Sequence, residues 1–324
     1  MNVLSLFDGM SCGMMALQRA GIKVDNYYSS EIDKYAMTVS AANYPEIIQV
    51  GDITKLDLST LPKIDLVMGG SPCQGFSVAG KGLAFDDPRS ALFFEFVKCV
   101  KELNPKYFLL ENVNMKKEWL AVIADYMGVE GIKINSALVS AQNRNRWYWS
   151  NIPGIEQPKD RGIVLRDILQ DDAEEPMYSN IYGGFNEKKP REHFNKSVTI
   201  RANSGGGSIP NVKLKDFDKN LARMTTKEGK AYALTASYNG AVAWNSIEKK
   251  QRSMIPTGKQ KTISVDNKQE VYWRKLTPVE CERLQTVPDN YTNHVSNTQR
   301  YKMLGNGWNV ETVVGILKKI KDDI

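Results

Sequence analysis

Short apolar runs alternate with helical patterns over the first third of the chain. Runs of strand length occupy 2–7, 27–32, the neighbourhood of Ile47, 65–68 and 107–110. Apolar residues recur at helical spacing within 13–20, 33–43 and 90–103. Gly21, Pro45 and the Asn104-Pro105 pair end these helical patterns. Strands that alternate with helices in this way predict an α/β domain with a parallel, doubly wound sheet.

The composition and the hydrophobic pattern of the chain change after Trp149. Scattered Gly, Asn, Lys and Pro follow, including Ser-Gly-Gly-Gly-Ser at 204–208, without a long helical period. A regular pattern resumes at Tyr272. It predicts a helix that starts at Thr277-Pro278 and an amphipathic helix at 310–320. We expect this terminal helix to pack on the first domain. The predicted organisation is a first domain of residues 1–157 plus 271–324, and a smaller, irregular, β-rich domain of residues 158–270.

The composition is that of a globular protein without a membrane segment. With 324 residues, 42% of them hydrophobic, the chain can bury a sizeable core in two domains. It has no run of about 18 apolar residues, and Met1 leads into the first strand without a basic leader. Four dispersed cysteines and two histidines do not suit a disulfide framework or a zinc site. We therefore expect an intracellular protein without a metal.

Positive charge is concentrated in the predicted second domain. The net charge is +6, and residues 187–261 hold 16 Lys and Arg against 6 Asp and Glu, a balance of +10 that leaves −4 for the rest. Such a local excess is expected of a surface that meets phosphates. A solvated, lysine-rich face would explain the charge equally well.

A glycine-containing turn follows the first strand, and acidic residues end the next two. The turn Phe-Asp-Gly-Met-Ser-Cys-Gly at 7–13 lets the backbone approach a ligand beside free helix amides. Its glycines lack the spacing of a dinucleotide-binding loop, which disfavours a nicotinamide or flavin cofactor. Glu31 could accept hydrogen bonds from ribose hydroxyls, and Asp52 could accept one from the adenine amine. Alternatively, each acid caps a helix or a turn.

A cysteine and a carboxyl group end the two strands after these. The segment Gly-Gly-Ser-Pro-Cys-Gln-Gly-Phe-Ser at 69–77 puts Cys73 at the sheet edge where doubly wound folds bind ligands. Flanked by glycine, proline and glutamine, this cysteine fills no core. The segment Leu-Leu-Glu-Asn-Val at 109–113 brings Glu111 to the same edge. The pair suits nucleophilic and acid–base chemistry.

Five motifs, in this order, resemble those of the DNA cytosine-5 methyltransferases. They are Pro-Cys-Gln at 72–74, Glu-Asn-Val at 111–113, Gln-Asn-Arg-Asn-Arg at 142–146, Arg-Lys-Leu-Thr-Pro-Val-Glu-Cys-Glu-Arg-Leu-Gln at 274–285 and Leu-Gly-Asn-Gly at 304–307. The resemblance implies a Rossmann-like methyltransferase sheet and a β-rich target recognition domain. It also implies methyl transfer from S-adenosylmethionine to C5 of cytosine in a specific double-stranded DNA sequence, with S-adenosylhomocysteine as the other product.

The resemblance assigns catalytic roles that fit the chemistry of cytosine. C5 is a poor nucleophile until a group adds to C6, and the thiolate of Cys73 would be that group. Glu111 would act as the acid near N3. Arg144 would contact the base, and Arg146 would help to orient the acid and the flipped nucleotide.

The resemblance also assigns the cofactor and DNA contacts. Phe7 would stack on adenine, Glu31 would bind the ribose, and Asn306 would bind the methionine end. The other predicted cofactor-binding residues are Asp8, Gly9, Met10, Ile32, Asp52, Ile53, Pro72, Leu92, Gly307 and Trp308. Because the target base must be rotated out of the duplex, the segment 74–89 is expected to be the mobile catalytic loop. The predicted DNA-binding residues are Gln74, Ser77, Arg89, Arg223 and Thr235.

Two departures from the family pattern stand out. Asn306-Gly307 is followed by Trp308 instead of a small residue, which looks like the eukaryotic de novo enzymes, whereas the large middle domain looks bacterial or viral. In the recognition-domain motif, Ala233 replaces a threonine, so that Thr235 is left as the candidate hydroxyl contact to phosphate. We expect a bacterial or phage-encoded monomer that acts on double-stranded DNA in the cytoplasm, at the nucleoid, with a cognate restriction endonuclease as a possible functional partner.

Three other functions compete with this interpretation. A transfer-RNA cytosine methyltransferase would keep the catalytic motifs, but the Cys-Phe-Thr signature of that group is absent, since the middle domain has no cysteine. A catalytically idle DNA-binding regulator is disfavoured by the intact Cys73, Glu111 and Arg144. A thymidylate-synthase-like enzyme would need neither the adenosyl-binding acids nor the second domain.

Overall fold

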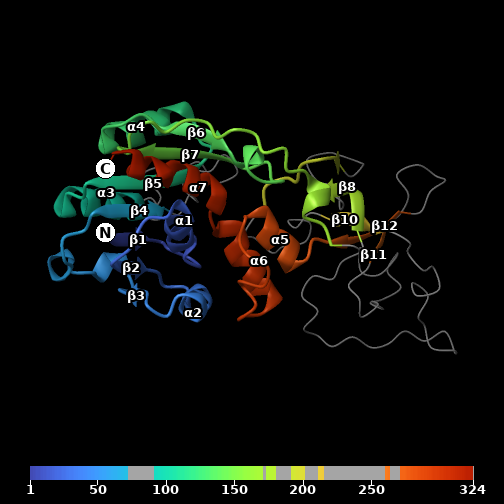
Figure 1. The fold of residues 1–324 in the computed structure, drawn as a ribbon, viewed down its shortest axis with the longest axis horizontal. Coiled ribbons are helices and arrows are strands. Elements are labelled where there is room, and N and C mark those ends of the chain that lie inside the picture. The colour runs from blue at the N-terminus through green and yellow to red at the C-terminus, as the bar shows by residue number, and fades with distance from the viewer. Residues whose placement is uncertain are drawn as a thin grey trace.

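The computed structural model of the protein describes residues 1–71, 91–170, 173–179, 191–200, 211–214, 260–262 and 271–323. These residues form a large sheet with helices on both faces and a separate small sheet (Figure 1). The large sheet carries the candidate site at one edge.

The large sheet has seven strands in the order β3-β2-β1-β4-β5-β7-β6. Their bounds are β1 Asn2–Leu6, β2 Asn26–Ser30, β3 Ile48–Gln49, β4 Leu66–Gly70, β5 Tyr107–Val113, β6 Ile132–Asn135 and β7 Asn145–Ser150. The first five strands pair in parallel, as the sequence predicts. Beyond these predicted parallel strands, β7 runs antiparallel to both β5 and β6, so the complete sheet is mixed. The link from β6 to β7 carries no crossover helix, and parallel pairing requires one.

Seven α-helices accompany these strands in the described part of the chain. They are α1 Cys12–Ala20, α2 Lys34–Asn43, α3 Ala91–Leu103, α4 Lys117–Met127, α5 Pro278–Leu284, α6 Asn297–Asn306 and α7 Val310–Leu317. Short 3-10 helices occupy Ile53–Lys55, Leu58–Thr60, Ser136–Leu138, Leu165–Asp167 and Lys318–Asp323. The predicted start at Thr277-Pro278 is confirmed: the Thr277 hydroxyl accepts from the Glu280 amide at 3.2 Å, and the Glu280 carboxylate accepts from the Thr277 amide at 2.7 Å.

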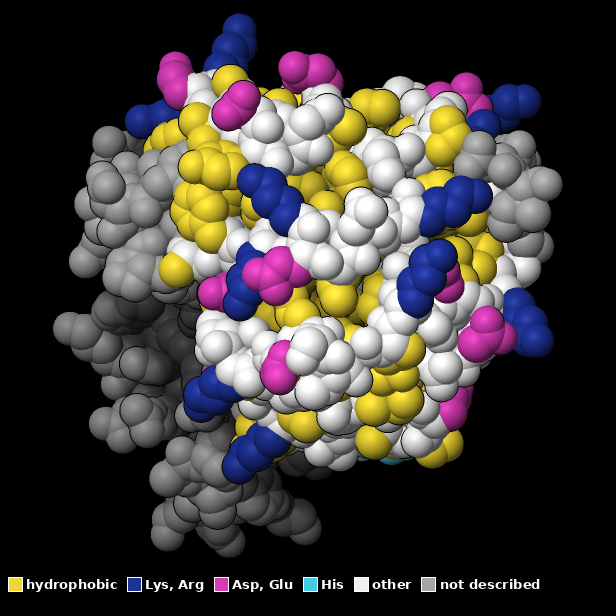
Figure 2. Space-filling model, turned by 90° about the vertical axis from the view of Figure 1, so that its left-hand side faces the viewer, with side chains coloured by type: hydrophobic (Ala, Val, Ile, Leu, Met, Phe, Trp, Pro, Cys, Tyr) yellow, Lys and Arg dark blue, Asp and Glu magenta, His cyan; other side chains and the backbone are white. Residues whose placement is uncertain are grey.

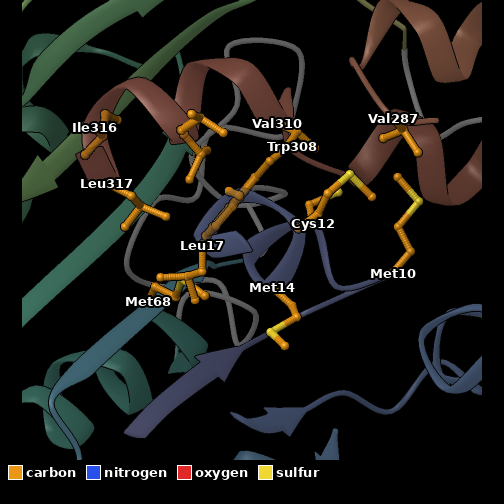
Figure 3. Packing of buried hydrophobic residues seen from close by; sticks show 14 of the residues in the cluster. Met10, Cys12, Met14, Leu17, Met68, Val287, Trp308, Val310, Ile316 and Leu317 are labelled. Carbon is orange, nitrogen blue, oxygen red and sulfur yellow. The ribbon is translucent and has the colours of Figure 1, made fainter. Parts of the chain in front are cut away.

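Alternate strand residues feed two separate cores. On β4, Leu66 and Met68 join one buried cluster with α1 and α7, whereas Val67 joins the other cluster with α3 and α4. This two-residue period is what a sheet covered on both faces requires. Figure 3 shows Leu17 of α1 and Leu317 of α7 within the first cluster. The predicted return of the C-terminal helix is therefore confirmed, since α7 packs against α1.

The second sheet is antiparallel, with strand order β11-β12-β10-β8-β9. Its strands are β8 Ala173–Ser179, β9 Arg191–His193, β10 Asn211–Leu214, β11 Gln260–Thr262 and β12 Val271–Lys275. The segment before β8 and the segment after β9 both pack on the first domain. Leu165 and Ile168 precede β8, Ile200 follows β9, and all three are buried in the core of the first domain. The domain boundaries stay a prediction.

Charges on the large domain are mixed. On the face turned away from the second sheet, basic and acidic side chains are interspersed (Figure 2). Among the described residues, no helix is long and apolar enough to cross a membrane. The described side chains also include no group of three or more His, Cys, Asp or Glu that could hold a metal ion.

Candidate active site

The β1–α1 turn is built around a carboxyl group that accepts four hydroxyl hydrogen bonds. Asp8 accepts from Ser5, Ser11 and Tyr27 at 2.6 Å each and from Ser29 at 3.0 Å. Phe7, Gly9 and Ser11 all have positive φ, which only glycine adopts without strain. The hydroxyl network therefore holds a turn that the local sequence alone disfavours. Burial raises the pKa of Asp8, although the hydroxyl donors oppose this shift.

The acid that ends β2 is bound to the same turn. One Glu31 oxygen accepts from the Gly9 amide at 2.7 Å, and the other accepts from the Ile32 and Asp33 amides at 2.7 and 2.8 Å. The Ile32 side chain beside it is 75% exposed. Glu31 is thus a structural brace between β1 and β2 as well as a candidate ribose contact.

The acid that follows β3 caps a short helix. Asp52 accepts from the Thr54 amide at 3.0 Å and from the Thr54 hydroxyl at 2.8 Å, which keeps the pKa of Asp52 below its ordinary value. The next residue, Ile53, is buried. The capping alternative raised for this acid is therefore correct, and it leaves a ligand role open, because Asp52 also faces a cavity.

A cavity of about 680 Å³ lies along the carboxyl edge of the large sheet. This is the size of a site for a drug-sized or cofactor-sized molecule. Among its lining residues are predicted ones from seven separate segments: Phe7, Asp8, Gly9, Glu31, Ile32, Asp52, Ile53, Leu92, Glu111, Arg144, Arg146, Asn306, Gly307 and Trp308. Of the predicted cofactor residues that the structure describes, Met10 alone does not line the cavity, since its side chain is buried in the core and its carbonyl accepts from the Tyr291 hydroxyl at 2.7 Å.

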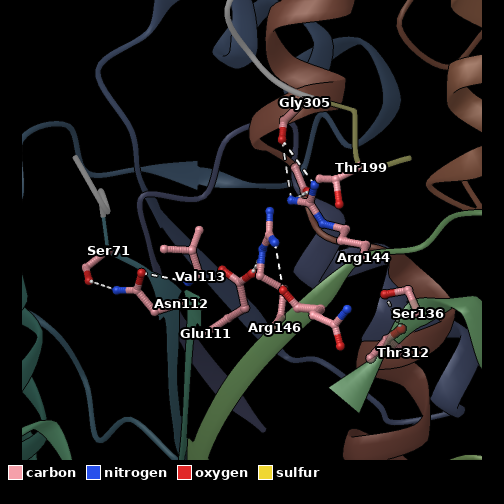
Figure 4. Close-up of polar contacts among 12 residues, drawn as sticks. Ser71, Glu111, Asn112, Val113, Ser136, Arg144, Arg146, Thr199, Gly305 and Thr312 are labelled. Atoms are coloured by element: carbon pink, nitrogen blue, oxygen red, sulfur yellow. Dashed lines mark hydrogen bonds and ion pairs between the residues drawn. The ribbon is translucent and has the colours of Figure 1, made fainter. Parts of the chain in front are cut away.

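An ion pair lies at the inner wall of this cavity. Arg146 Nε is 2.9 Å from Glu111 Oε1, and both side chains are nearly buried (Figure 4). The antiparallel pairing of β5 with β7 brings the two residues together. The other carboxylate oxygen, Oε2, lies so close to Gly70 that a Cβ there would approach it to 2.9 Å. Glycine at position 70 is therefore a requirement of the Glu111 position.

Arg144 is oriented differently from Arg146. Its side chain is 2% exposed and donates to the Gly307 carbonyl at 2.9 Å and to the Gly305 and Ile200 carbonyls at 3.4 Å. Burial, and then the nearby charge of Arg146, lower the pKa of Arg144 to about 9. Figure 4 shows the two guanidinium groups with separate sets of partners.

Sequence reasoning missed several residues of this cavity. Asn112 donates to the Ser71 hydroxyl at 3.1 Å and accepts from the Val113 amide at 2.8 Å, so it joins the ends of β4 and β5. Its place in the Glu-Asn-Val motif could have revealed it. Lys302 forms an ion pair with Asp33 at 2.6 Å. No sequence signal marks this pair, because its members are 269 positions apart.

Seven predicted site residues lie outside the described residues. They are Pro72, Cys73, Gln74, Ser77, Arg89, Arg223 and Thr235. The assigned nucleophile and all predicted DNA contacts therefore stay predictions. The described chain before the Pro-Cys-Gln motif is strand β4, which ends at Gly70, and Ser71, which precedes Pro72.

Comparisons with known proteins cover the whole chain. The family model for C-5 cytosine-specific DNA methylases matches residues 1–322. The Type II methyltransferase M1.ScrFI of Lactococcus lactis subsp. cremoris is 31% identical over 98% of this chain and 77% of its own length. The orphan methyltransferase M.SPRI of Bacillus phage SPR is 26% identical over 99% of this chain and 97% of its own length. The solved structure of Entamoeba histolytica methyltransferase EhMeth has a similar fold, with a TM-score of 0.66, 15% identity and 99% and 98% coverage of the two chains.

Proposed function

The chain belongs to the C-5 cytosine-specific DNA methylase family, whose members methylate carbon 5 of cytosine in DNA, and from this premise we propose how it does so. The methyl donor is S-adenosylmethionine, the nucleophile is Cys73, and the substrate is a cytosine rotated out of double-stranded DNA. The observation that carries the proposal is the Glu111–Arg146 ion pair on the wall of the large cavity, beside the strand end that leads to Cys73.

The residues of the cavity suit the proposed methyl donor. Glu31 and Asp52 offer carboxylates to ribose hydroxyls and to an adenine amine, and Phe7 and Ile53 offer apolar contact to a purine. Asn306 and Gly307 line the same cavity. When bound, S-adenosylmethionine supplies an electrophilic methyl group. The role of these residues is to bind the donor and to keep water from it.

The side chains around the base divide the remaining work. The Cys73 thiolate forms a bond to C6, which pushes electrons towards C5 and N3. Glu111 donates a proton or a hydrogen bond at N3, where negative charge develops. Arg146 holds one Glu111 oxygen, so the other is left to face the base. After C5 is methylated, its proton is lost and the Cys73–C6 bond breaks, which restores the aromatic ring.

The other three cysteines are poor candidates for the nucleophile. Cys12, Cys99 and Cys281 are all buried. Burial raises the pKa of Cys12 and of Cys99 to about 12. It also raises the pKa of Cys281 well above its ordinary value. Because the thiolate is the reactive form, these side chains are protonated and inert at neutral pH.

Double-stranded DNA would be bound mainly by the second domain. Its segment 187–261 carries the excess of ten positive charges, whereas charges are mixed on the face of the large domain shown in Figure 2. Neutralising phosphates through this segment would make binding strongly salt-dependent. The names of the bacterial relative and the phage relative fit a role in DNA modification, with or without a restriction partner.

Trapping with 5-fluorocytosine tests this mechanism directly. Fluorine at C5 cannot leave as a proton does, so the Cys73–C6 bond should persist. DNA containing 5-fluorocytosine, incubated with S-adenosylmethionine, should form a covalent complex that survives denaturation. Cys73→Ser should form none, because a serine hydroxyl is protonated at neutral pH and is a weaker nucleophile. Replacement of Cys99 or Cys281 by serine is the matched control and should leave trapping intact. An adduct that persists in Cys73→Ser would refute the assignment.

A further inference from the structure

Three segments that are far apart in the sequence meet at Arg144. The chain at 141–143 runs beside 197–199: the Ser197 amide donates to the Ala141 carbonyl and the Asn143 amide donates to the Ser197 carbonyl, both at 2.7 Å. The Thr199 hydroxyl donates to the Asn143 carbonyl at 2.7 Å. Segment 197–200 thus leads from the body of the large domain towards the basic middle part of the chain.

The Arg144 guanidinium connects this segment to the cofactor side of the cavity. Its NH1 is shared between the Ile200 and Gly305 carbonyls, and its NH2 reaches the Gly307 carbonyl. Gly305 and Gly307 flank the end of α6, where free carbonyls attract a positive charge. These two residues and the one between them line the cavity. One side chain therefore holds both the entry to the second domain and a wall of the proposed cofactor site.

The contacts of Arg144 differ from those of a base-reading or acid-pairing arginine. Within the described residues no carboxylate lies within ion-pair distance of it, whereas Arg146 has Glu111. Its bonds to Ile200 and Gly305 are 3.4 Å, longer than the usual 2.9–3.0 Å. A small movement of 197–200 would shorten or break the bond to Ile200. It would thereby change how the Arg144 guanidinium is placed against the carbonyls of residues 305 and 307.

We infer that Arg144 is a positioning residue that couples the two substrates: DNA engaged by the second domain fixes segment 197–200, and Arg144 transmits this to residues 305–307, which then hold the cofactor more tightly. This coupling rests on the proposed use of S-adenosylmethionine and DNA. By linkage, the cofactor raises DNA affinity by the same factor.

The experiment is a binding cycle with S-adenosylhomocysteine, which allows no turnover. Its dissociation constant is measured by calorimetry with and without an excess of unmethylated, PCR-amplified double-stranded DNA. The wild-type protein should bind it between about 5-fold and 150-fold more tightly with DNA, the usual range of such coupling. Arg144→Met should bring this ratio close to one. Arg144→Lys, which keeps one donor group, should retain part of it.

Two further variants separate coupling from simple damage to the fold. Thr199→Val removes a hydrogen bond of the same junction outside the cavity and should also lower the ratio, even if Arg144→Met does not fold. Arg161→Lys, which changes an arginine that pairs with Glu311 and does not line the cavity, should keep the wild-type ratio. A purely structural role for Arg144 would weaken binding equally with and without DNA.

The inference is overturned by a wild-type ratio of one, or by a ratio that stays at the wild-type value in both Arg144→Met and Thr199→Val. A wild-type protein that binds no S-adenosylhomocysteine under either condition would overturn the proposed cofactor instead, so the two failures are distinguishable.

Discussion

The two ends of the cavity are built by different means. At the end formed by β1, β2 and β3, each acid is bound by groups close to it in sequence or on the adjacent strand: Asp52 by Thr54, and Glu31 by the amides after it and by Gly9. At the end formed by β5 and β7, Glu111 is bound by Arg146, which is 35 positions away in the sequence. The first end is made by turns, the second by strand pairing.

This difference suggests that one end of the cavity serves ligand binding and the other end serves the chemical step. Glu31 and Asp52 are held mainly by amides next to them in sequence, so they can serve as preformed contacts for a ligand. The Glu111–Arg146 pair depends on an antiparallel register that a one-residue slip would destroy. We therefore expect substitutions at the turn-built end to change affinity and substitutions at the strand-built end to change rate.

Glu111→Gln should have the largest effect and should act on the rate alone. The amide keeps the size of the side chain and can still bind Arg146, but it cannot donate a proton to N3. Loss of general acid catalysis lowers kcat by about 10²–10⁴-fold. The turnover rate is measured with tritiated methyl donor, and the affinity for S-adenosylhomocysteine by calorimetry. A comparable loss of affinity would show that the two ends of the cavity are not independent.

The turn-built end is also the part that the sequence predicts well. The acids at 31 and 52 follow apolar runs whose ends can be located from glycine, proline and strand length, so their positions at the sheet edge follow from local pattern. The Glu111–Arg146 contact is implied only by the family resemblance, because the pattern alone does not reveal that β7 lies between β5 and β6. That order depends on a non-local pairing, and the helix α4 and strand β6 before it carry no motif.

Asp52→Ala should weaken cofactor binding without changing the maximal rate. Loss of one hydrogen bond from the cofactor to this exposed carboxylate should raise the dissociation constant by about tenfold. The measurement is calorimetry with S-adenosylhomocysteine, together with kcat at saturating cofactor. Asp57→Ala is the matched control: Asp57 caps the next 3-10 helix through Ser59 in the same way, at 3.0 Å to the amide, but does not line the cavity. Equal losses of affinity in both variants would mean that only the caps matter.

The Asp8 network shows what local pattern could not supply. Sequence reasoning assigns Asp8 to the cofactor by resemblance, and it does line the cavity. Yet its two oxygens accept from four hydroxyls, two of them on β2. Serine and tyrosine at those positions look like ordinary strand residues until the register of β1 with β2 is known. Its main role in the structure is to hold the turn.

The smallest effect is expected at Asp8, where the predicted change is in the pH dependence of stability. Because its pKa is raised in the folded protein, chiefly by burial, the folded state holds this proton more strongly than the unfolded state does. Stability is therefore lost as pH rises from the ordinary value of 3.8 through the raised pKa. Asp8→Asn carries no titrating group, and the four hydroxyls can turn to donate to its oxygen or accept from its amide.

The free energy of unfolding of Asp8→Asn relative to wild type should therefore increase from acidic to neutral pH and then level off, as measured by urea unfolding at a series of pH values. Asp57→Asn gives the opposite sign, because hydrogen bonds from Ser59 lower the pKa of Asp57 and its contribution is lost as pH falls. If Asp8→Asn instead loses stability towards neutral pH, the ionised carboxylate is the form that the hydroxyls stabilise. The hydroxyl hydrogen bonds would then have a larger effect on the Asp8 pKa than burial has. The turn at this end of the cavity would be stabilised by a buried negative charge.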